Sequence, residues 1–459
     1  MQHKFSLKNI LYILEFDKTV FYSLFSKIWS ILSGSLTVSL VVYFFTKSQQ
    51  GFYYTFASLL ALQTFVEMGL GFVIQQFSSH EWSNLNFEKN IGVVGNIESI
   101  SRLTSIARIS IIWYAFAGIL AFIILATFGT YFFYNSTHNF EIWFWPWIFL
   151  CVFSSLNLIL TPVWSMLEGC NQVQKLYGFR FLQSVISNIL VWIAIVYGLN
   201  LWAIVFSSIA SLFVSIVFIN RDYKLFIKDL FLKKPKGSVI NWKRDMLQMQ
   251  WRVAVSWLSG YFAFNLFTPM LFKFQGPEIA GQFGMSWSII SIICNLGLSW
   301  VNPKIPPLAI LVSEKNYKEL DTKFYKLIKI MSFITISISI IFLTIVLNTR
   351  YININFLTKT VNRLLPFNSL LILVLAQFFN IISNPFSIYM RMHKKEPVMF
   401  LSILQSVLIT ISVYFTCKYY TINLMSISFL FINVIILLLI IKKWKKFKME
   451  VQSLILNIS

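Results

Sequence analysis

Apolar stretches of membrane-spanning length recur along almost the whole chain. A helix needs about 20 largely apolar residues to cross the hydrocarbon core of a bilayer. Windows of this kind lie near 19–45, 52–79, 105–134, 142–168, 177–198 and 200–219. Six more lie near 249–272, 279–312, 325–348, 364–390, 398–417 and 420–441. We therefore predict an all-α integral membrane protein with twelve transmembrane helices.

The composition excludes a soluble globular protein. Apolar residues make up 57% of the chain and charged residues only 12%, against about 25% charged residues in ordinary soluble domains. Alternating apolar and polar segments separated by turns are absent, so a membrane β-barrel is not expected. The four cysteines are far apart and form no CxxC pair, so neither a disulfide framework nor a metal site is predicted.

The distribution of basic residues orients the predicted helices. With both termini in the cytoplasm, 32 of the 38 lysines and arginines fall on the cytoplasmic side and 6 on the other. Such an excess is typical of cytoplasmic loops. The formal net charge of +21 therefore reflects membrane topology, and nucleic-acid binding is not predicted.

The two halves of the sequence repeat each other. The segment Glu67–Gln76 aligns with Asn295–Lys304 at an offset of 228, and Pro162 aligns with Pro385 at 223. Leu182–Ser187 also matches Leu404–Ile409, at an offset of 222. We predict an N-terminal six-helix lobe (1–220), a cytoplasmic inter-lobe loop (221–247) and a C-terminal six-helix lobe with a basic tail (248–459). Six helices per lobe imply a parallel internal repeat, a plan that suits alternating access.

The sequence resembles a known family, over nearly the whole chain in its number of spans, six-plus-six repeat and central basic loop, and locally in one stretch. The run Lys47–Phe56, continuing through Glu67-Met-Gly-Leu-Gly71, resembles the first helical hairpin of bacterial polysaccharide-biosynthesis membrane proteins. These are the O-antigen flippases of the multidrug/oligosaccharidyl-lipid/polysaccharide exporter superfamily. The resemblance implies a two-lobe transporter in the bacterial inner membrane. Such a transporter would move an undecaprenyl-pyrophosphate-linked oligosaccharide from the cytoplasmic to the periplasmic leaflet.

A cargo of this kind needs cations for its phosphates and hydrogen-bonding groups for its sugars. The predicted substrate-binding residues are the cations Lys304, Arg252 and Lys273, together with the polar residues Gln75, Gln76 and Asn295. Lys304 lies among three prolines that are expected to break a helix. The alternative interpretation is a lysine at a helix end whose ammonium group reaches the interface.

Four arginines near the cytoplasmic face are candidates for docking the pyrophosphate, and four tryptophans are candidates for stacking on sugar rings. For each of them the competing interpretation is an ordinary anchoring or packing role. The arginines are Arg102, Arg108, Arg180 and Arg391, and the tryptophans are Trp164, Trp257, Trp287 and Trp300.

Glu67 is a carboxylate within an apolar segment, where a charge costs about 2.5–3.5 kcal/mol. Three interpretations are open. Glu67 pairs with a basic residue of a neighbouring helix, lines the aqueous cavity near the cargo, or binds a coupling proton or sodium ion. Asn295 occupies the corresponding position of the second repeat, so the charge is not a requirement of the repeated scaffold.

Signatures of catalysis are absent: no HExxH, GxSxG, Walker A or dinucleotide-binding glycine motif occurs. We predict a transporter that is not an enzyme and has no cofactor beyond a coupling proton or sodium ion. The alternatives are a cation-coupled multidrug exporter of the same superfamily and a polytopic polysaccharide polymerase or glycosyltransferase. Expected partners are the lipid-linked oligosaccharide and membrane lipids, with a polysaccharide polymerase and chain-length proteins as further candidates.

Overall fold

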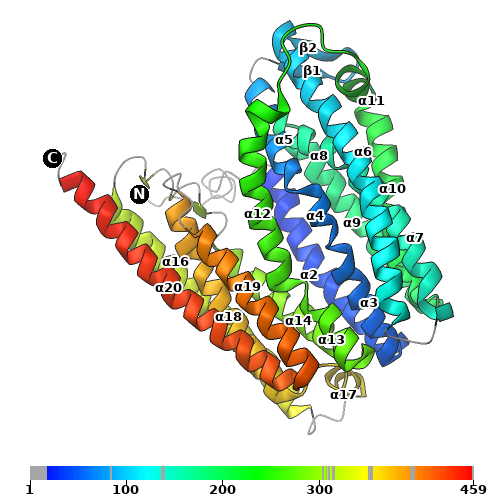
Figure 1. The fold of residues 1–459 in the computed structure, drawn as a ribbon, viewed down its shortest axis with the longest axis vertical. Helices are drawn as coiled ribbons and strands as arrows, with labels where there is room; N and C mark the ends of the chain where they lie inside the picture. Colours follow the sequence, from blue (N-terminus) through cyan, green and yellow to red (C-terminus); the bar gives the residue numbers. More distant parts are fainter. Residues whose placement is uncertain are drawn as a thin grey trace, which may run out of the picture. The chain divides into compact units, whose positions relative to one another are not determined.

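The computed structural model describes residues 18–82, 85–135, 140–301, 304–305, 308, 311–312, 316–349, 355–392 and 398–456. These residues are almost entirely helical (Figure 1). Their contacts divide the chain into two units. Unit 1 comprises Met1–Phe45 and Leu59–Trp257, and unit 2 comprises Thr46–Ser58 and Leu258–Ser459.

Unit 1 contains most of the elements from the first half of the chain. Its helices are α2 (Lys18–Phe44), α4 (Gln63–Glu67), α5 (Leu70–Trp82), α6 (Ile97–Tyr134), α7 (Phe140–Ile159), α8 (Thr161–Gly169), α9 (Val173–Val196) and α10 (Trp202–Asp222). The segment after α10 forms α11 (Lys224–Ile227) and the π-helical turns η1 (Lys228–Leu232) and η2 (Trp242–Met246). Helix α12 (Leu247–Phe264) then begins in unit 1 and ends in unit 2.

Unit 2 contains the remaining helices. These are α3 (Lys47–Leu60, as far as Ser58), α13 (Phe267–Gln275), α14 (Pro277–Leu298), α16 (Tyr317–Asn348), α17 (Asn355–Val361), α18 (Phe367–Arg391), α19 (Met399–Tyr419) and α20 (Ile422–Leu456). Helices α18 and α20 lie side by side over much of their length (Figure 1).

Nine helices within the described residues are long and apolar enough to span a membrane, and ten if the bent pair Lys47–Glu67 and Leu70–Trp82 is one span. The other two predicted spans fall on α2 and on α12 with α13. The chain is therefore a multi-pass membrane protein, whereas the count of twelve spans remains a prediction.

The segment 46–58 packs with unit 2, although the sequence analysis assigns it to the N-terminal lobe. Glycines allow this close packing. A Cβ added to Gly51 would overlap the Pro277 carbonyl oxygen, and one added to Gly281 would lie 2.8 Å from the Gly51 nitrogen. The Gln50 side chain is buried and donates to the Gly281 carbonyl oxygen at 2.8 Å. Close helix contact through small residues is common in membranes.

A short antiparallel hairpin was not predicted. Strand β1 (Leu85–Glu88) pairs with β2 (Gly92–Gly95) between α5 and α6. Each strand has only four residues, too few for a clear alternating pattern in the sequence. The hairpin packs by its Phe87 ring, which stacks on Tyr223 at a centroid distance of 5.4 Å.

Candidate functional site

Glu67 lies at a break between two helices of unit 1. Helix α4 ends at Glu67, and Met68 (φ 49°) and Gly69 (φ 63°) adopt left-handed backbone angles before α5 begins. The helices on either side of this break are bent by 50°. Because α4 stops at Glu67 and α5 begins at Leu70, the spacing of Glu67, Gly71 and Gln75 does not place the three residues on one face of a continuous helix.

Glu67 is held by a tyrosine. The Tyr114 hydroxyl of α6 donates to Glu67 Oε1 at 3.1 Å, and Tyr114 is completely buried. Gly71 makes room for this contact, since a Cβ at that position would lie 2.9 Å from Ser165 Oγ and 3.1 Å from Glu67 Oε1. No lysine or arginine among the described residues lies within 4.0 Å of this carboxylate. Within the part of the chain that the structure describes, the partner of Glu67 is therefore a neutral hydroxyl.

A polar pocket of about 380 Å³ lies in unit 2. Helix α14 contributes the predicted residue Asn295, whose side chain is exposed to the pocket. Most of the other polar lining comes from α18, with Ser402 added by α19. Among the described residues, the lining contains one arginine and no carboxylate. Its polar side chains are Ser291, Asn295, Gln377, Asn380, Ser383, Asn384, Ser387, Arg391 and Ser402.

The polar residues of α18 form a stripe along one side of the helix. They follow one another at intervals of three or four residues, which places them on a single helical face. The stripe runs through Gln377, Asn380, Asn384, Ser387 and Arg391. Proline at 385 cannot donate the usual helical hydrogen bond, so the Ile381 carbonyl, which belongs to a pocket-lining residue, loses its helical donor. The stripe thus concentrates hydrogen-bonding capacity inside an apolar span.

Hydrogen bonds between amide groups of three helices hold part of this stripe in place. Asn433 of α20 is 1% exposed, and its Oδ1 accepts a hydrogen bond from Gln405 Nε2 at 2.8 Å. Gln405 Nε2 also lies 3.3 Å from Asn380 Oδ1. Asn380 Nδ2 in turn donates to Gln377 Oε1 at 2.9 Å. The network links α18, α19 and α20 and holds two pocket-lining amides.

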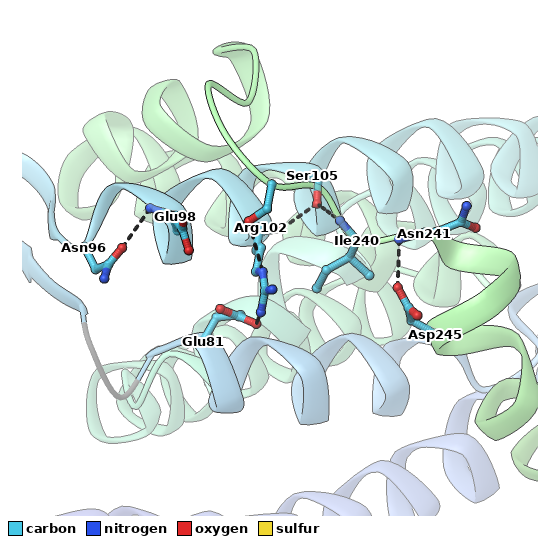
Figure 2. A network of polar contacts seen from close by, with 9 residues as sticks. Glu81, Asn96, Glu98, Arg102, Ser105, Ile240, Asn241 and Asp245 are labelled. Carbon is cyan, nitrogen blue, oxygen red and sulfur yellow. Dashed lines mark hydrogen bonds and ion pairs between the residues drawn. The ribbon is translucent and has the colours of Figure 1, made fainter.

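A second polar pocket, of about 490 Å³, lies in unit 1 beside the segment that follows α10. Its lining includes the predicted residue Gln76, together with Arg102 and Arg244. Figure 2 shows Arg102 pointing toward Glu81, and the two side chains form an ion pair of 3.5 Å. Arg102 Nε also donates to Ser238 Oγ at 3.1 Å.

The segment 237–245, predicted as part of a loop, is bound to α6. The Gly237 and Ile240 N–H groups donate to Ser101 Oγ and Ser105 Oγ at 2.8 and 3.0 Å, the second of which is drawn in Figure 2. Asp245 accepts from the Asn241 N–H at 3.0 Å. The Arg244 side chain and this N–H lower the pKa of the partly exposed Asp245 carboxyl, so the carboxylate stays ionised at neutral pH.

The other predicted site residues lie outside both pockets. Lys304 and Lys273 are exposed, and Lys273 Nζ lies 5.5 Å from the centroid of the Phe274 ring. Gln75 is half-buried in α5. The Arg252 side chain lies outside the described residues, as do prolines 303, 306 and 307 of the predicted helix break. Of the predicted substrate-binding residues whose side chains the structure describes, Asn295 and Gln76 line these two pockets, as do the candidate docking arginines Arg391 and Arg102.

The candidate tryptophans lie mostly among other rings. Trp287 borders the unit 2 pocket but stacks on Phe283 and Phe267 at 5.6 and 5.8 Å between centroids. Trp164 stacks on Phe179 at 4.9 Å. These contacts fit a packing role. Trp300 is exposed, and the Trp257 side chain lies outside the described residues.

Sequence reasoning overlooked the amides of α18 and α20. Arg391, a candidate for docking the pyrophosphate at the cytoplasmic face, is the last residue of α18 and lines the unit 2 pocket together with the α18 amides. The available signal was the recurrence of polar residues every three or four positions from 377 to 391. Such a stripe in a membrane span indicates a face turned away from lipid.

Comparisons with known proteins identify the fold. No protein-family profile and no curated protein sequence matches the chain. An inward-facing MATE multidrug resistance transporter of the MOP superfamily is similar, with a TM-score of 0.61 and 16% identity over 90% of this chain and 96% of that one. The lipid II flippase MurJ in an inward closed conformation also has a TM-score of 0.61 and 16% identity, over 92% and 87% of the two chains.

A crystal structure of a mutant MATE protein gives a TM-score of 0.52 at 15% identity, over 95% of both chains. The chain has the fold of MOP-superfamily transporters. Two of these structural neighbours are a multidrug resistance transporter and a lipid II flippase. At such low identity the likeness concerns the fold alone.

Proposed function

We propose that this protein is a flippase that moves a lipid-linked oligosaccharide across the bacterial inner membrane by alternating access. The observation that carries the proposal is the unit 2 pocket, in which amides, hydroxyls and one arginine line a cavity within apolar helices. Polar groups in a membrane interior are costly unless they find hydrogen-bonding partners. A hydrated sugar chain supplies such partners.

The chemistry of the pocket suits a cargo with both sugars and phosphate. Asn and Gln side chains each offer donors and an acceptor, and serine offers a hydroxyl, which matches the alternating donors and acceptors of sugar hydroxyls. Arg391 lies at the end of the same stripe. A guanidinium group binds phosphate oxygens in a bidentate manner. The cargo would be an undecaprenyl-pyrophosphate-linked repeat unit of O-antigen or a related polysaccharide.

A gene deletion tests the proposal. Cells without the protein should lose the surface glycan and accumulate complete lipid-linked repeat units that are accessible only from the cytoplasmic side. The leaflet can be determined with an impermeant enzyme that modifies the glycan in oriented membrane vesicles. Complementation with the intact gene should restore both properties. Normal surface glycan in the deletion strain would contradict the proposal.

A second candidate function is a cation-coupled drug exporter. It is favoured by one observation, the partly buried Glu67 carboxylate in unit 1, since intramembrane carboxylates bind cations or protons in many transporters. The same deletion strain distinguishes the two functions. Raised sensitivity to cationic dyes with unchanged surface glycan would favour the exporter.

A further inference from the structure

A groove of about 400 Å³ lies between α9 and α10 of unit 1. Part of its lining is apolar and includes Leu182, Val214 and Val217. Leu182 is 50% exposed and Val217 46% exposed, so the apolar wall is open. The end of the groove is basic because Lys175 and Arg221 line it.

Positive charge exceeds negative charge at this basic end. Asp222 is the carboxylate in the lining, and both of its oxygens are occupied. Lys89 Nζ lies 2.7 Å from Oδ1, and Arg221 Nη2 lies 2.8 Å from Oδ2. With Lys175, which also lines the groove, this end has three cations and one carboxylate, which leaves two positive charges in excess. An anion placed here would be attracted by the cations and would meet no unpaired carboxylate oxygen.

The basic end of the groove lies next to buried aromatic side chains. Lys175 Nζ lies 5.9 Å from the centroid of the Tyr223 ring, within the distance of a cation–π interaction. Tyr223 is fully buried, stacks on Phe87 of the hairpin and donates its hydroxyl to Gln172 Oε1 at 3.2 Å. Lys89, in the turn of the same hairpin, reaches Asp222. The hairpin and the start of α9 therefore position the cations beside the apolar groove.

We propose that this groove binds an anionic phospholipid of the surrounding membrane. Its phosphate would lie between Lys175 and Arg221, and one acyl chain would lie along Leu182 and Val217. Basic pockets between transmembrane helices bind cardiolipin head groups in this way. The groove belongs to unit 1 and shares no residue with the polar pocket of unit 2, and the inference does not depend on the identity of the cargo.

Lipid binding by the purified full chain tests this site. Native mass spectrometry with added cardiolipin, phosphatidylglycerol and phosphatidylethanolamine gives the affinity for each lipid. We expect the two anionic lipids to bind more tightly than phosphatidylethanolamine. The double variant Lys175→Gln/Arg221→Gln should weaken cardiolipin binding about tenfold. The control Lys234→Gln/Lys236→Gln removes the same charge from exposed positions outside the groove and should leave the affinity unchanged.

A second pair of variants tests the apolar wall without changing charge. Val217→Trp should fill the groove and weaken cardiolipin binding, whereas Phe213→Trp changes a 66% exposed position of the same helix that does not line the groove. Size-exclusion profiles and melting temperatures confirm that each variant is folded. Equal binding of all three lipids, equal loss in both charge variants, or full binding by Val217→Trp would each overturn the proposal.

Discussion

Corresponding positions of the two units share a hydrogen-bonded frame but differ in the chemistry that the frame holds. In unit 1, Gln183 Nε2 donates to Ser211 Oγ at 2.8 Å, and Ser211 Oγ donates to Asn157 Oδ1 at 3.1 Å. In unit 2, Gln405 contacts both Asn433 and Asn380. The three residues of unit 2 follow those of unit 1 at offsets of 222 or 223, close to the offsets of the predicted repeat.

Around this frame the units diverge. Glu168 and Arg180 of unit 1 form an ion pair of 2.6 Å. At the matching offsets unit 2 has Arg391 and Ser402, which both line its open pocket. Likewise Glu67 is bonded to Tyr114, whereas its counterpart Asn295 lines the pocket. These polar groups of unit 1 are thus satisfied by one another, while their counterparts in unit 2 border a cavity that can hold a ligand.

The largest effect on glycan export is expected when Arg391 of unit 2 is given the negative charge of its unit 1 counterpart, Glu168. Arg391→Glu places a carboxylate in the pocket, where it would repel a phosphate instead of binding it. We expect glycan export to fall about a hundredfold, equivalent to about 2.7 kcal/mol, with Arg391→Lys retaining part of the activity. Export is measured as surface glycan normalised to the amount of protein in the membrane. Full export by Arg391→Glu would show that this pocket does not contact an anionic cargo.

The two frames can be compared directly by removing the matched glutamines. Gln405→Leu and Gln183→Leu each leave buried polar partners unsatisfied, which costs about 1–3 kcal/mol per group. Both variants should have a lower melting temperature in detergent. Only Gln405→Leu should also lower export per molecule, about tenfold, because Asn380 borders the pocket. Equal export by the two variants would mean that the unit 2 frame serves stability alone.

The Glu67 site of unit 1 should respond mainly in stability. Glu67→Ala removes the acceptor of the buried Tyr114 hydroxyl and should lower the unfolding free energy by about 1–3 kcal/mol. Glu67→Gln keeps an acceptor oxygen and should have a smaller effect, as should Tyr114→Phe, which removes the hydroxyl itself. Melting temperatures and export are measured for all three. Loss of export in Glu67→Gln at unchanged stability would instead point to ion coupling or to contact with the cargo.

The sequence allowed the apolar spans to be predicted because a bilayer demands long uninterrupted apolar segments. The packing of residues 46–58 with unit 2 could not be predicted from the sequence, because it depends on contacts of Gly51 with residues more than 200 positions away. Three residues singled out in the sequence, Asn295, Arg391 and Trp287, line the unit 2 pocket. The hydrogen-bonded amides of this pocket were missed because they lie on three different helices. Their contacts with one another cannot be seen from single polar residues in separate spans.

Substitution of Lys304 should have the smallest effect on export. It extends the comparison of the two units because Gln76 occupies the corresponding position of unit 1. Its side chain is exposed and lies outside the unit 2 pocket. Attraction between an exposed cation and a phosphate is weakened by water and salt. Lys304→Ala should therefore reduce export about twofold at unchanged protein abundance, and Lys304→Arg should preserve it. In proteoliposomes the difference should shrink as ionic strength rises. A loss as large as that expected for Arg391→Glu would place the main anion contact at Lys304 and remove Arg391 from that role.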